Sequence, residues 1–220
     1  SLDYDDDVNN ENNAWISEQT VSVVPGPAST YSDLNADGYT DFVYQGSNTR
    51  PYVKYLDDNG DLISTESLWP QGLGDWELLG TSDANGDGQV DLYFANNEVD
   101  VGVWYMDGST RTGTAMIARD IQGWGKPVVG DLDGDGNGDF VWSHTDGRIA
   151  HWILDDTQML TAAFYNFNQN GWQVRAIRDF DGDGDGDLLV QQNDNSAQIW
   201  YLEDNARTSV ESIDLSFNDW

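Results

Sequence analysis

The sequence predicts an all-β fold of the β-propeller type, built from four visible units of about 48 residues with four strands each. Three observations predict it. The acidic motif Asp-x-Asp/Asn-x-Asp-Gly-x-x-Asp occurs four times, beginning at Asp33, Asp83, Asp131 and Asp179 with steps of 50, 48 and 48 residues. Tryptophan recurs at fixed distances from this motif. The segments between these landmarks are short and rich in aromatic and β-branched residues, which is typical of strands.

Composition supports a folded chain and excludes two classes of partner. Of the 220 residues, 38% are hydrophobic and ten are tryptophan, so a substantial core can be buried. The net charge is −31, which repels nucleic acid and anionic membranes. No apolar run is long enough to cross a bilayer, so membrane insertion is not expected. There is no cysteine, which excludes disulfides and thiolate metal sites.

The first 25 residues break the repeat, so we divide the chain at that point. Residues 1–25 are predicted to be an acidic leader, in which Ala14 to Val24 could supply a strand that closes the ring. Residues 26–220 are predicted to be the propeller repeats, with units starting near residues 26, 76, 124 and 172.

Each unit is predicted to contain four antiparallel strands. One strand enters the acidic loop, one leaves it, a third carries a tryptophan, and the fourth is the outer strand. The dipeptides Asn59-Gly60 and Asp146-Gly147 indicate hairpin turns. Because most tryptophans occupy positions that repeat with the motif, packing between neighbouring blades explains them better than sugar binding does.

The acidic motif has the chemistry of a calcium loop. Side chains at its first, third, fifth and ninth positions can point at one centre, together with the backbone carbonyl of the seventh. Glycine at the sixth position permits the sharp turn that such a loop needs. An all-oxygen donor set without histidine or cysteine favours Ca²⁺ over zinc or copper. The predicted metal ligands are Asp33, Asn35, Asp37, Tyr39 and Asp41; Asp83, Asn85, Asp87, Gln89 and Asp91; Asp131, Asp133, Asp135, Asn137 and Asp139; and Asp179, Asp181, Asp183, Asp185 and Asp187.

We therefore predict about four Ca²⁺ ions, one in each repeat, with a structural role. Without the ion, the carboxylates of one loop repel one another, whereas with it the loop becomes a rigid corner between two strands. Loops three and four carry one more carboxylate than loops one and two, since Asn35 and Asn85 are replaced by Asp133 and Asp181. We expect loops three and four to bind calcium more tightly.

These motifs resemble the FG-GAP or VCBS repeat family, whose calcium loops occur in integrin α-subunit propellers and in exported bacterial proteins. The segment Gly130 to Trp142, with Trp124 before it and Trp152 after it, is similar to a bacterial member. The resemblance covers about residues 26 to 220, and it implies a propeller with one calcium loop in each blade. Relatives often have seven blades, so closure with four blades, a homo-oligomer and a larger parent chain all stay open.

The resemblance implies an extracellular calcium-binding module, secreted or at the cell surface of a bacterium, that acts in binding or adhesion. Carbohydrate or a protein surface is the expected ligand. No catalytic or organic-cofactor residues are predicted, because His144 and His151 do not recur in the other units and no nucleophile motif accompanies them. Two alternatives stay open: a catalytic propeller acting on a polysaccharide, and an accessory domain of a larger secreted enzyme or adhesin.

Overall fold

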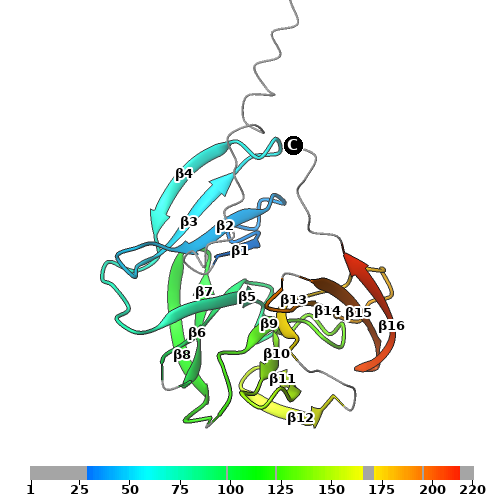
Figure 1. The fold of residues 1–220 in the computed structure, drawn as a ribbon. Helices are drawn as coiled ribbons and strands as arrows, with labels where there is room; N and C mark the ends of the chain where they lie inside the picture. The colour runs from blue at the N-terminus through cyan, green and yellow to red at the C-terminus, as the bar shows by residue number, and fades with distance from the viewer. Residues whose placement is uncertain (1–28, 98, 122, 166–170, 195, 214–220) are drawn as a thin grey trace, which may run out of the picture.

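The chain forms a four-bladed β-propeller (Figure 1). The structure, a computed structural model, describes residues 29–213 apart from residues 98, 122, 166–170 and 195. This part of the chain contains sixteen strands and no helix, and the strands form four antiparallel sheets of four strands each. The predicted all-β propeller is therefore confirmed. The predicted acidic leader and ring-closing strand lie outside the described residues.

Every blade is a simple meander in which consecutive strands pair. Blade 1 consists of β1 (Ser29–Ser32), β2 (Asp41–Gln45), β3 (Pro51–Leu56) and β4 (Leu62–Ser67). Blade 2 consists of β5 (Glu77–Ser82), β6 (Asp91–Ala95), β7 (Val101–Asp107) and β8 (Thr110–Ala118). Blade 3 consists of β9 (Val128–Gly130), β10 (Asp139–Ser143), β11 (Ile149–Asp155) and β12 (Gln158–Phe164). Blade 4 consists of β13 (Gln173–Arg178), β14 (Asp187–Gln191), β15 (Ala197–Glu203) and β16 (Ala206–Ile213).

The first strand of each blade lies nearest the propeller axis. Strand β1 contacts β5, β5 contacts β9, and β9 contacts β13. A Cβ atom at Gly130 would lie only 2.6 Å from Cβ of Ile177, so the close passage of β9 and β13 requires glycine there. Three apolar clusters fill the spaces between consecutive blades, and fully buried Trp142 belongs to the cluster between blades 2 and 3.

The two end blades are less covered than the inner ones. The face of blade 4 that is directed away from blade 3 carries Leu189 and Ile199, which are half-buried, whereas their counterparts in blade 2, Tyr93 and Val103, are fully buried. Among the described strands, β13 makes no contact with β1 comparable to those between consecutive blades. The described blades therefore form an arc whose ends do not pack against each other as neighbouring blades do.

None of the described segments is a helix long and apolar enough to span a bilayer.

Candidate functional site

The four acidic loops lie at the same end of the propeller, because each connects the first strand of a blade to the second. Loops of neighbouring blades touch. The backbone N–H of Gly186 in loop four donates to the carbonyl of Leu132 in loop three at 3.1 Å, and Oγ of Ser82 lies 3.1 Å from the carbonyl oxygen of Gly136. The carboxylates of the four loops are thus gathered at this end of the propeller.

Each loop is bent at two positions where the backbone is left-handed. At the sixth position, glycine has a φ of 91°, 84°, 91° and 103° in loops one to four, which confirms the reason given for glycine there. The fourth position is left-handed too, and it is glycine in three loops but Ala36 in loop one, with a φ of 56°. Loop one therefore contains backbone strain that the other three loops avoid.

The first-position and fifth-position aspartates shape the loop through its own backbone. The carboxylate of the first position accepts the N–H of the sixth-position glycine at 2.7 to 3.1 Å in all four loops. The carboxylate of the fifth position accepts the N–H of the seventh residue at 2.7 to 2.9 Å. The bonds of the fifth position span two residues and are Asx-type turns, whereas those of the first position span five residues. Together they hold the loop in a curved conformation.

The ninth-position aspartate is a buried structural tie. Asp41, Asp91, Asp139 and Asp187 are all 0% exposed. In each blade, one carboxylate oxygen accepts the N–H of the second loop residue at 2.8 to 3.1 Å. The other oxygen accepts an N–H from the third strand at 2.8 to 3.2 Å.

The backbone N–H that the third strand donates to the ninth-position carboxylate lies at an irregularity in the pairing of that strand. In every blade the pairing of the third and fourth strands shifts register immediately before that residue, for example between Ile153 and Leu154. A β-bulge takes a backbone N–H out of the strand ladder, and a buried N–H without an acceptor is costly. The ninth aspartate therefore joins the acidic loop, the second strand and the bulge of the third strand.

In loop three, and again in loop four, the structure brings three carboxylates together. Single oxygens of Asp131, Asp133 and Asp139 lie within 4.8 Å of one another, and those of Asp179, Asp181 and Asp187 do the same. These are the first, third and ninth positions of the motif, and each group could hold a metal ion. The fifth-position aspartates, Asp135 and Asp183 in these loops, lie outside the groups. In loops one and two the third position is asparagine, which supplies an amide oxygen in place of the third carboxylate.

Burial and crowding disfavour the charged forms of these aspartates. Burial raises the pKa of Asp139 to about 7, although the N–H groups of Leu154 and Leu132 act in the opposite direction. Burial likewise raises the pKa of Asp91 to about 6. Asp133 is exposed, but partial desolvation and the neighbouring charge of Asp135 still raise its pKa. A divalent cation bound by these oxygens would favour the ionised forms, so the donor set fits a hard cation.

Two aromatic clefts lie at equivalent positions of blades 2 and 3. The blade 2 cleft has a volume of about 340 Å³ and is lined by residues that include Trp76, Trp104 and Met116. The blade 3 cleft has a volume of about 210 Å³ and is lined by residues that include Trp124, Trp152 and Phe164. These residues occupy the same three positions relative to the acidic loop in the two units. The repeat therefore builds the same cleft twice.

The tryptophans predicted to pack between blades do so only in part. Trp200 is 1% exposed and belongs to the core between blades 3 and 4. Trp76, Trp104, Trp124 and Trp152 are half-buried, and each has one side in an apolar cluster and another at the edge of a cleft.

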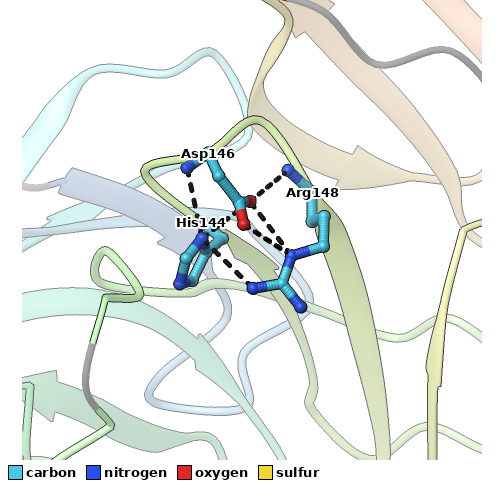
Figure 2. A network of polar contacts seen from close by, with 3 residues as sticks. All are labelled: His144, Asp146 and Arg148. Carbon is cyan, nitrogen blue, oxygen red and sulfur yellow. Dashed lines mark hydrogen bonds and ion pairs between the residues drawn. The ribbon is translucent and has the colours of Figure 1, made fainter.

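The two histidines lie in different surroundings. His144 is in the turn between β10 and β11, where its Nδ1 lies 2.7 Å from Oδ1 of Asp146 (Figure 2). Nε of Arg148 donates to both oxygens of Asp146, at 3.0 and 2.8 Å, so the three side chains form one network (Figure 2). His151 is buried on β11 against the ring of Tyr165, and burial lowers its pKa. The hairpin does not bring the two histidines into one site.

Comparison with known families agrees with this geometry. The sequence profile of the FG-GAP-like repeat matches residues 83–142, which extend from the second acidic loop to the end of the strand after the third. Over these residues the chain resembles the FG-GAP-like repeat family. The resemblance inferred from the motif is thereby confirmed, and the match covers the second and third acidic loops and the strands between them. No curated protein compared with the chain matches it.

Sequence reasoning missed two features of this propeller. The first is the fourth loop position, and the glycines at 86, 134 and 182 were a visible signal of it. The second is the structural tie made by the ninth aspartate. Its signal was weaker, namely its place directly before the first apolar residue of each second strand.

Proposed function

We propose that the protein is an extracellular calcium-stabilised binding module whose ligand is a carbohydrate. The four acidic loops would each hold one Ca²⁺ through the side chains at the first, third, fifth and ninth positions and the carbonyl of the seventh. The bound ion supplies positive charge that offsets the repulsion between carboxylates. The residues themselves form a corner that is already curved by the Asx-type turns and tied to the third strand.

The calcium proposal is supported by the two groups of three converging carboxylates. It is tested by isothermal titration calorimetry of the metal-free protein with CaCl₂ and, separately, with MgCl₂. We expect about four calcium ions per chain and weaker magnesium binding, because Mg²⁺ demands a stricter octahedral geometry and loses its water reluctantly. A stoichiometry of zero for calcium would refute this part of the proposal.

The observation that supports a carbohydrate ligand is the repetition of the aromatic cleft in blades 2 and 3. A tryptophan ring at the mouth of a cleft can stack through its face on the C–H groups of a sugar ring, and two equivalent clefts suit a ligand that itself repeats. A flat protein surface would not need two equivalent hollows. We therefore favour carbohydrate over a protein surface, although both fit a propeller used in adhesion.

The carbohydrate proposal is tested on a glycan array, with calcium and with EDTA. Phe164 is 50% exposed at the rim of the blade 3 cleft, and Leu160 is 55% exposed on the same strand but outside the cleft lining. We expect Phe164→Ala to weaken glycan binding and Leu160→Ala to leave it unchanged. Equal effects of the two variants would remove the cleft from the proposal, and an array without any bound glycan would favour a protein ligand.

A catalytic propeller acting on a polysaccharide is the alternative that one specific observation favours. His144, Asp146 and Arg148 form a network at the mouth of a cavity, and a histidine oriented by a carboxylate is a common general base. The test is an assay for new reducing ends and for unsaturated products after incubation with polysaccharides. Product formation that disappears in His144→Ala would establish this alternative in place of a binding module.

An extracellular location is proposed because calcium loops of modest affinity fill where calcium is millimolar. Export from a bacterium is proposed on the resemblance alone. Measuring the dissociation constant of the loops tests the argument. Values in the range of about 10⁻⁴ to 10⁻³ M agree with an extracellular module, whereas values near 10⁻⁸ M would fit an intracellular buffer.

A further inference from the structure

A cavity between blades 3 and 4 carries positive charge on a chain that is otherwise strongly acidic. We name it the basic pocket, and its volume is about 540 Å³. Its charged lining consists of Lys126, Arg148, Arg175 and Asp146. Three cations and one carboxylate give the lining a net charge of +2 with His144 neutral, whereas the whole chain has a net charge of −31. Three of the nine lysines and arginines of the protein thus line one cavity.

The basic pocket lies at the opposite end of the blades from the acidic loops. It is formed by the turn between the second and third strands of blade 3 and by the start of the first strand of blade 4. In an antiparallel meander that turn lies at the far end of the second strand from the calcium loop. The positive charge is therefore separated from the carboxylate cluster by the length of a blade.

The cations of the pocket differ in how far their charge is already compensated. Lys126 forms an ion pair with Glu77, and Arg148 is held by Asp146 through its Nε. Nε of Arg175 donates to the neutral amide oxygen of Gln191 at 3.1 Å, and no ion pair of Arg175 is found within the described residues. The guanidinium of Arg175 is therefore the cation best placed to bind an added anion.

The rest of the lining suits a sugar. Trp172, which repeats the position of Trp76 and Trp124, is half-buried and contributes an aromatic surface. Ser143, Gln173 and Asn193 contribute hydroxyl and amide groups that can bond to sugar hydroxyls. An aromatic surface with several neutral polar groups beside it is typical of sites that bind polar small molecules.

We propose that the basic pocket binds a single acidic sugar at the end of a glycan, with its anionic group on Arg175 and Arg148 and its ring against Trp172. This inference rests on the proposed function as a carbohydrate-binding module, and it adds the class of sugar and the place of binding. The planar guanidinium groups match the geometry of a carboxylate or sulfate. A long polyanion is disfavoured, because the acidic surface outside the pocket would repel it.

The test compares three disaccharides that differ in one group. The terminal sugar is glucuronic acid, glucose, or glucose 6-sulfate, and binding to the calcium-loaded full chain is measured by isothermal titration calorimetry. We expect Arg175→Gln to weaken the glucuronate disaccharide about tenfold or more, since a hydrogen bond to a charged group is lost. Arg119→Gln removes the same charge from an exposed site outside the pocket and should leave binding unchanged.

The outcomes separate the two proposals. Stronger binding of the glucuronate than of the glucose disaccharide, lost in Arg175→Gln, supports the basic pocket, and the sulfated disaccharide tells whether the group must be a carboxylate. Equal binding of acidic and neutral disaccharides with no effect of Arg175→Gln overturns the basic pocket and leaves the carbohydrate module intact. Failure of every glycan, on the array and in the calorimeter, overturns both. Arg175→Lys, which keeps the charge, and the melting temperature show whether a loss reflects charge or misfolding.

Discussion

Replacing Asp139 by alanine should destabilise the protein even when no calcium is bound. Both oxygens of Asp139 accept backbone N–H groups, from Leu132 and Leu154, each at 2.8 Å, and the side chain is 0% exposed. Each buried N–H left without an acceptor costs about 1–3 kcal/mol, so the two together cost about 2–6 kcal/mol. Removing a buried carboxylate with a raised pKa offsets part of that cost. We expect a net loss of about 2–4 kcal/mol in the free energy of unfolding.

The assay is urea and thermal unfolding followed by circular dichroism at pH 7 in EDTA. A loss of this size corresponds to a melting temperature lower by roughly 5–15 °C for a domain of this length. Asp133→Ala is the matched control, because Asp133 belongs to the same predicted calcium site but is exposed. It should change the stability of the metal-free protein by less than about 0.5 kcal/mol.

The two variants separate a structural tie from a metal ligand. If Asp139 acts only as a ligand, both substitutions will be silent in EDTA, and both will reduce the stabilisation by calcium by the share that loop three contributes. That result, or equal destabilisation by the two variants in EDTA, would refute the reasoning from the β-bulge. If Asp139 is a structural tie, Asp133→Ala lowers the stability only in the presence of calcium. Asp139→Ala then lowers the stability both in EDTA and in calcium.

Four further predictions concern the same loops. Removing calcium with EDTA should lower the melting temperature, and the account of the loops fails if it does not. In site-resolved titrations, Asp133→Asn should weaken calcium binding in loop three, and Asn85→Asp should strengthen it in loop two. Stronger binding in the first variant or weaker binding in the second would contradict the role of the third carboxylate. Burial raises the pKa of Asp139 to about 7 and that of Asp91 to about 6, so protonation of these side chains stabilises the metal-free fold. This stabilisation is complete only below about pH 4, the usual pKa of aspartate, and is lost as the pH rises through about 6 and 7. The melting temperature of the metal-free protein should therefore fall as the pH rises from about 5 to 8, and a rise would refute this. Ala36→Gly should stabilise by about 0.5–1 kcal/mol in denaturant unfolding, because it relieves a left-handed backbone, whereas no gain would show that loop one is unstrained.

The fold could be predicted from the sequence because the chain consists of repeats. Four copies of one motif at steps of 48 to 50 residues fix four equivalent units, and the short run of aromatic and β-branched residues after Asp139 marks a strand whichever way the units are assembled. Asp146-Gly147 marked a hairpin turn, and Gly147 has the positive φ of 91° that such a turn requires. These signals are local, so they survive without any knowledge of tertiary contacts.

The site could be predicted only in part, because much of it depends on contacts between strands and between blades. Spacing showed that carboxylates alternate in each loop, but it could not show that Asp139 also accepts an N–H from Leu154, since that bond depends on a bulge in another strand. Nor could it show that Arg175 and Arg148, from different blades, share one cavity. His144 and His151 illustrate the limit in the other direction: they are close in sequence, yet only His144 lines the basic pocket, while His151 is buried against Tyr165.

The sequence by itself determined the repeating unit, the position of its acidic loops and the chemical type of their donors, because these depend on neighbours along the chain and on residue chemistry. Only the tertiary structure decided which carboxylates converge, which of them brace the blade, and where the scarce positive charges meet. Those properties arise from contacts between strands and between blades. The sequence does not indicate which residues far apart in the chain will lie close together in space.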